Sequence, residues 1–127
     1  MTTDLNEIKA KLIQALEKHS RVLKVTSNSA DKFEVHGTIR APQGKQMVDG
    51  IYFASILLKA KDVRFYFFPI YTHKNAIDPL VSADVRKFLK GKSCFHVKKL
   101  DEEMLGSIGN MIDEGIKRFQ ADGLLAS

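Results

Sequence analysis

The sequence predicts an α+β fold, a two-layer sandwich in which N- and C-terminal helices pack on one face of a mostly antiparallel sheet of about five strands. Apolar residues recur with helical spacing at both ends of the chain, and strand-like segments fill the middle. Residues 51–71 hold seven of the chain's eleven Phe and Tyr residues, in two apolar runs separated by the polar break 59–62. Such a hairpin has almost no polar face, so it is expected at the centre of the sheet.

The first helix is predicted over residues 4–19. Its apolar positions fall on one helical stripe, at offsets 0, 3, 7, 10 and 11, and Thr3 is the expected N-cap. The stripe consists of Leu5, Ile8, Leu12, Ala15 and Leu16. A first strand is expected over residues 21–26.

The next strand, residues 33–39, alternates between apolar and polar side chains. This pattern predicts that Phe33 and Val35 face the helices, whereas Glu34 and His36 face the opposite side of the sheet. Residues 41–50 contain Pro42 and two glycines and are expected to form a loop before the aromatic hairpin.

Beyond Tyr71 the chain should leave the sheet, because Pro69 cannot donate a ladder hydrogen bond. Residues 72–79 are expected to be irregular. Ser82 is the predicted cap of a short helix that runs to about residue 90 and ends at Gly91.

A short strand over residues 93–98 and a final helix from 102 to about 119 complete the chain. Alternation along this strand directs Phe95 and Val97 to the helices and Cys94, His96 and Lys98 to the other side. The helix is expected to begin at the N-cap Asp101. Its inner stripe is predicted to be Leu105, Ile108, Ile112, Ile116 and Phe119.

Length and composition indicate one domain, residues 1–127, of ordinary globular character. Cys94 is the only cysteine, so no disulfide can form within the chain. The sequence also shows neither a signal peptide nor an apolar run long enough to span a membrane. These features favour a soluble protein of a reducing compartment, most simply a bacterial cytoplasm. The net charge is +5, and residues 87–99 carry five lysines. These lysines are expected to form a solvated rim or a rim that binds anions.

Three segments, residues 48–54, 63–69 and 88–101, together resemble the YdhG-like domains of unknown function. The aromatic hairpin and the run Leu89-Lys90-Gly91-Lys92 carry most of the likeness. The resemblance implies a frataxin-like fold and, because one member of the family has been described as an iron chaperone, a role in iron handling. Frataxin-like iron binding uses a ridge of acidic residues, whereas the acidic residues of the first helix here are interleaved with lysines. Metal handling is therefore the alternative function.

The main expectation is a non-enzymatic module that binds a small ligand or a protein through the open face of the sheet. Hairpin aromatics would form an apolar floor bordered by polar groups, unless they serve as core or as a homodimer interface. No cofactor is expected, and neither a membrane nor nucleic acid is an expected partner. An enzyme using Cys94 as nucleophile and His96 as base is the third hypothesis. The candidate ligand-binding residues are His36, Tyr66, His73, Cys94, His96 and Lys98.

Overall fold

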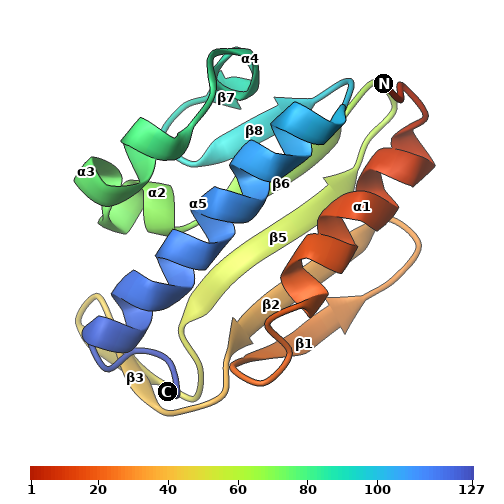
Figure 1. The fold of residues 1–127 in the computed structure, drawn as a ribbon. Coiled ribbons are helices and arrows are strands. Elements are labelled where there is room, and N and C mark those ends of the chain that lie inside the picture. Colours follow the sequence, from red (N-terminus) through yellow and green to blue (C-terminus); the bar gives the residue numbers. More distant parts are fainter.

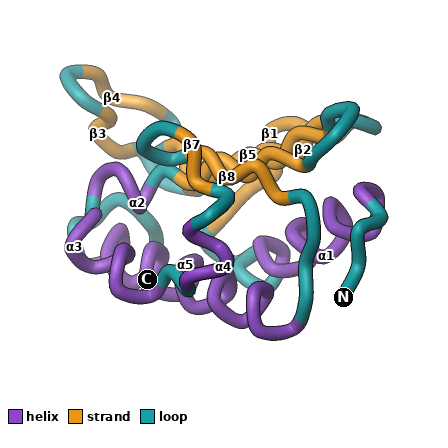
Figure 2. Tube along the Cα trace, turned by 90° about the horizontal axis from the view of Figure 1, so that it is seen from above, coloured by secondary structure: helices purple, strands orange, loops and turns teal.

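The computed structural model describes residues 1–127 as two layers, one of helices and one of strands (Figures 1 and 2). The helices are α1 (Leu5–Glu17), α2 (Pro69–Thr72), α3 (Lys74–Ile77), α4 (Ala83–Arg86) and α5 (Glu102–Ala121), with a 3-10 turn η1 at Asp78–Leu80. The strands are β1 (Leu23–Asn28), β2 (Lys32–Gly37), β3 (Ala41–Gln43), β4 (Gln46–Val48), β5 (Tyr52–Leu58), β6 (Val63–Phe67), β7 (Leu89–Lys90) and β8 (Cys94–Val97).

Six strands form one open, antiparallel sheet in the order β1-β2-β5-β6-β8-β7. The aromatic hairpin β5–β6 lies at its centre, as the sequence predicts. The long helices α1 and α5 lie side by side on one face (Figure 1), and the opposite face carries no helix (Figure 2). The small hairpin β3–β4 projects from that opposite side at one end of the sheet (Figure 2).

The core lies between the sheet and the two long helices. Phe33, Ile56, Phe65 and Phe95 pair in register across four strands, and each is at most 1% exposed. The register places them all on the helix side, because paired residues share a face. From α1 the core receives Ile8, Leu12 and Leu16, and from α5 chiefly Ile108, Met111, Ile112 and Phe119.

Several details of the first half differ from the sequence-based expectation. The helix α1 ends at Glu17 instead of residue 19, and β1 spans Leu23–Asn28 instead of residues 21–26. Asp4, not Thr3, is the N-cap of α1, and its Oδ1 accepts hydrogen bonds from the backbone N–H groups of Asn6 (2.9 Å) and Glu7 (3.2 Å). The strand β2 ends at Gly37 instead of continuing to residue 39. Residues 41–50 are not only a loop, because they contain the hairpin β3–β4, whose turn holds Gly44 at a φ of 63°.

The second half departs from expectation between residues 69 and 91. Residues 72–79 form helical turns instead of irregular chain, and α4 is shorter than predicted. Its cap is confirmed, since the Ser82 hydroxyl accepts a hydrogen bond from Val85 N–H. Instead of extending the helix, Leu89 and Lys90 form β7, and Gly91 (φ 68°) turns the chain into β8. The cap of α5 is also confirmed, because Asp101 Oδ1 accepts from Met104 N–H at 2.8 Å.

None of the helices combines the length and the apolar character needed to cross a lipid bilayer.

Candidate functional site

The face of the sheet turned away from the helices, called the open face below, is built by strand register. One row across it consists of Lys32, Leu57, Arg64 and His96, and the next of Glu34, Ser55, Tyr66 and Cys94. His36 pairs with Tyr52 at one end of the second strand. Four of the predicted residues therefore share this face: His36, Tyr66, Cys94 and His96.

A hydrogen-bonded chain of side chains runs across β2 and β5. The Ser55 hydroxyl donates to Glu34 Oε1 at 2.9 Å, so the Tyr52 hydroxyl, 2.7 Å away, is the donor to Ser55. Glu34 Oε2 lies 3.6 Å from His36 Nε2. The other ring nitrogen of His36 is 2.7 Å from Thr26 Oγ1. Each side chain is thus held in one orientation by its neighbours.

Burial controls the protonation of this chain. Desolvation lowers the pKa of His36 below 6.5, and it outweighs the opposing effect of Glu34. Desolvation also raises the pKa of Tyr52 to about 12. Tyr52 is therefore a hydrogen-bond donor throughout the physiological range, and the neutral form of His36 is favoured.

A second group of polar side chains lies on β6 and β8. Asp62 is 7% exposed and has two partners, Arg64 Nε at 3.3 Å and His96 Nδ1 at 3.6 Å. Cys94 lies opposite Tyr66 and is 8% exposed. Burial raises the pKa of the Cys94 thiol, and the interaction with Cys94, followed by burial, raises the pKa of Tyr66.

These contacts do not assemble a nucleophile with its base. His96 is directed to Asp62, and Cys94 pairs with Tyr66. A catalytic cysteine needs an adjacent base and a lowered thiol pKa, whereas the pKa of Cys94 is raised. No group of three or more His, Cys, Asp or Glu side chains is arranged to hold a metal ion.

Two predicted residues lie outside this cluster. His73, between α2 and α3, belongs to the helix layer, where its Nε2 is 2.7 Å from Asp122 Oδ2 and its ring packs against Phe119 of α5 (5.5 Å between ring centroids). It therefore does not border the open face. Lys98 follows the last residue of β8 and is exposed.

Most of the hairpin aromatics serve as core, which is one of the two alternatives that the sequence left open. The hairpin residues Phe53, Phe65 and Phe67 are 0% exposed and belong to the core under the helices. The open face receives Leu57, Tyr52 and Tyr66 together with the few polar residues of the hairpin, chiefly Ser55 and Arg64. Sequence reasoning had no reason to single out Ser55 and Arg64, although each is a polar residue within an otherwise apolar strand. Tyr52 was missed for a different reason, a β-bulge between residues 52 and 54 that shifts the register.

Comparison of the chain with protein-family models, with curated proteins and with solved structures finds no match. The resemblance to YdhG-like domains therefore stays a prediction, and function has to be inferred from the geometry of the surface.

Proposed function

We propose that this protein is a non-enzymatic binding module that recognises an acidic protein partner through its open face. The observation that carries the proposal is the chain of hydrogen bonds from Tyr52 through Ser55 to Glu34, on a sheet face that no helix covers (Figure 2). Side chains fixed before binding lose less conformational entropy when a partner docks. An ordered polar face of this kind suits protein recognition.

The charge on the open face gives the chemistry of the partner. Its two acidic side chains are already engaged, Glu34 by Lys32 at 3.4 Å and Asp62 by Arg64. Two further lysines, Lys24 and Lys90, are exposed and share this face through their register with His36 and Cys94. They stand at opposite edges of the sheet and leave an excess of positive charge. Complementary potentials favour an acidic surface and speed its association.

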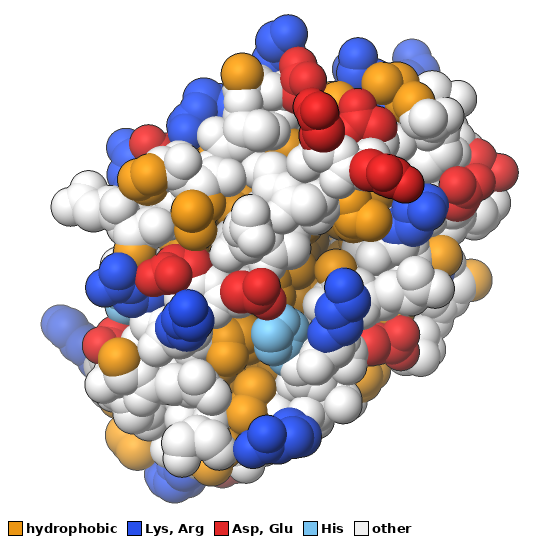
Figure 3. Space-filling model, viewed as in Figure 1, with side chains coloured by type: hydrophobic (Ala, Val, Ile, Leu, Met, Phe, Trp, Pro, Cys, Tyr) orange, Lys and Arg blue, Asp and Glu red, His pale blue; other side chains and the backbone are white.

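Three competing functions are less well supported. A small ligand would need a cavity, and none of the three main cavities is lined by the residues of the open face. A homodimer through this face would bring the excess lysines of both copies together, which is unfavourable. For metal handling, acidic side chains gather on the helix side where α1 and α5 begin (Figure 3), but no group of three or more His, Cys, Asp or Glu side chains is arranged to hold a metal ion.

The test uses a short poly-glutamate peptide as the acidic probe and amide NMR to locate where it binds. We expect saturable shifts centred on residues 34–36, 64–66 and 94–96, weakening between low and ~0.15 M salt because part of the attraction is electrostatic. The double variant Lys24→Glu, Lys90→Glu should lose this binding. A matched control is Lys99→Glu, Lys117→Glu, which reverses two lysines that are exposed but lie outside the strands.

The outcomes separate the alternatives. Equal loss in the control would show that net charge alone attracts the peptide and would refute recognition by the open face. Tighter binding of single-stranded DNA than of the peptide on the same residues would assign the face to nucleic acid. Dimerisation in light scattering, with concentration-dependent amide shifts on the same residues, would identify a self-association surface.

A further inference from the structure

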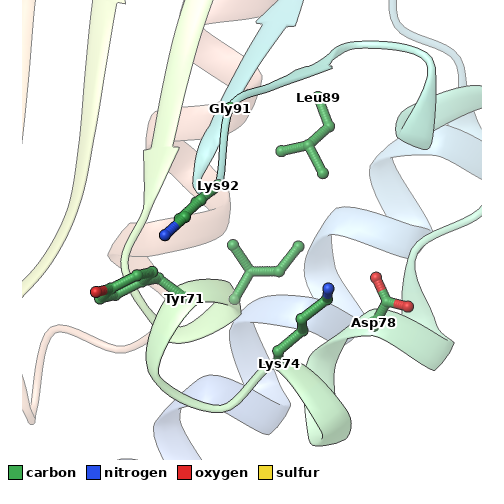
Figure 4. Close-up of a pocket in the computed structure, with 7 residues that line it drawn as sticks. Tyr71, Lys74, Asp78, Leu89, Gly91 and Lys92 are labelled. Atoms are coloured by element: carbon green, nitrogen blue, oxygen red, sulfur yellow. The ribbon is translucent and has the colours of Figure 1, made fainter.

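A cavity of about 310 Å³ lies between the helical segment α2–α3 and the turn that joins β7 to β8 (Figure 4). It is lined by Ile70, Tyr71, Lys74, Asp78, Leu89, Gly91 and Lys92. We propose that this cavity binds a small organic anion, with its carboxylate or phosphate group between Lys74 and Lys92 and its apolar body against Leu89 and the side chain of Tyr71. The site is separate from the open face and independent of the function proposed above.

Local sequence explains how the two walls meet. Pro69 begins α2 at the end of β6 and places Ile70, 3% exposed, with its side chain on the core. On the other wall, Leu89 of β7 pairs with Phe95 of β8. Gly91 then takes the left-handed conformation (φ 68°) that turns the chain from one strand into the other. Lys92 follows directly, and its ammonium group points toward Tyr71 at the edge of the cavity (Figure 4).

The cavity has an excess of positive charge. Lys74 and Lys92 are both exposed, and neither forms an ion pair within the chain. The single acidic lining residue, Asp78, is engaged by Arg86, which contacts its carboxylate and its carbonyl oxygen, each at 2.8 Å. The hydrogen bond from Arg86 lowers the pKa of Asp78. The nearby charge of Lys74 lowers this pKa as well, but Arg86 supplies the hydrogen bonds, so Lys74 keeps its own donors for an incoming anion.

Tyr71 positions one of these lysines. Its ring is 55% exposed, stacks on Phe68 (6.1 Å between centroids, planes 19° apart) and lies 5.5 Å from Lys92 Nζ. A cation above an aromatic ring is attracted to the face of that ring. The Tyr71 ring therefore attracts the Lys92 ammonium to the edge of the cavity.

The chemistry and size of the lining define the ligand class. Leu89 and the 55% exposed Tyr71 offer an apolar surface, and two ammonium groups offer charge-assisted hydrogen bonds to an anionic group. The volume is at the lower end of the range for small-molecule sites. A ligand the size of phenyl phosphate fits this description, and a nucleic acid or a protein segment does not.

The experiment titrates the protein with phenyl phosphate and, separately, with phenol and inorganic phosphate, by calorimetry and amide NMR. We expect saturable binding of phenyl phosphate, with amide shifts confined to residues 70–78 and 89–92. Phenol and inorganic phosphate should each bind at least tenfold more weakly, because phenol lacks the anionic group and inorganic phosphate lacks the apolar ring. Lys74→Gln with Lys92→Gln should weaken binding at least about tenfold through the loss of two charge-assisted contacts.

The matched control is Lys59→Gln with Lys61→Gln, two exposed lysines beside the turn between β5 and β6. This variant loses the same net charge and should bind phenyl phosphate as the wild type does, and so should Lys24→Glu. The proposal is overturned if phenyl phosphate shows no saturable binding up to about 10 mM. It is also overturned if the control weakens binding equally, or if inorganic phosphate binds as tightly as phenyl phosphate.

Discussion

The seating of α5 on the sheet can be tested at a single glycine. An ideal Cβ at Gly115 would lie 2.9 Å from Phe67 Cζ and 2.9 Å from Pro69 Cγ. In the same helix, a Cβ at Gly106 or Gly109 would meet no atom within 4 Å. The three positions share one helix but differ in what faces them.

The expected effects have opposite signs. Replacing a glycine by alanine inside a helix stabilises it by up to about 1 kcal/mol. We therefore expect Gly106→Ala and Gly109→Ala each to raise the free energy of unfolding by roughly that amount. At Gly115 the same gain is opposed by overpacking against Phe67, which is 0% exposed, at a cost of about 1–3 kcal/mol. Gly115→Ala should therefore lie about 1–3 kcal/mol below the other two variants.

Urea and thermal unfolding measure the difference. For a domain of this size, 1 kcal/mol corresponds to a melting-temperature change of roughly 3–5 °C. The dependence on urea concentration should be the same in all three variants, because the surface exposed on unfolding hardly changes. If Gly115→Ala proved as stabilising as Gly106→Ala, α5 would not approach β6 and the start of α2 as closely as described.

Three further predictions concern local features. Asp4→Ala should destabilise the protein by about 1 kcal/mol in urea unfolding, whereas Thr3→Ala should have almost no effect, because Asp4 caps α1; equal effects would contradict this cap. The pKa of His36 is lowered in the folded state, so just below pH 6.5 the unfolded state binds more protons than the folded state does. The free energy of unfolding should therefore decrease as the pH is lowered from 7 through that region. His36→Gln should remove this contribution, and a pH dependence identical to that of the wild type would refute it. Cys94 is buried with a raised thiol pKa, so its reaction with a disulfide reagent at pH 7 should be at least about tenfold slower than that of a free cysteine and should reach the free rate in urea; fast labelling of the native protein would contradict its burial.

Much of the fold follows from periodicity. The apolar stripes of α1 and α5 repeat over several turns, and the hairpin β5–β6 is too apolar to lie at an edge, so these elements and their layers are predictable. The strands β3, β4 and β7 are not, because two or three residues are too short to show alternation. At the start of α1, Thr3 and Asp4 are both good N-caps, and only the backbone geometry distinguishes them.

The candidate site was predictable where strands are regular. Alternation alone places His36 on one side of β2 and both Cys94 and His96 on the same side of β8. Alternation cannot place His73, which lies beyond the sheet in a connection that the sequence suggested was irregular. Nor can it show that Asp62, in the turn between the hairpin strands, contacts His96 on another strand.

The bulge in β5 explains why the main hydrogen-bonded chain was hidden from the sequence. In a regular strand, Tyr52 and Ser55 would point to opposite faces, because their separation is odd. The register shift between Val35 and His36 adds one residue to β5, so Phe53 enters the core while Tyr52 turns to the open face. The Tyr52 hydroxyl can then reach Ser55 and, through it, Glu34. One extra residue thus serves both layers, since it adds an aromatic ring to the core and completes the ordered polar face on which the proposed recognition depends.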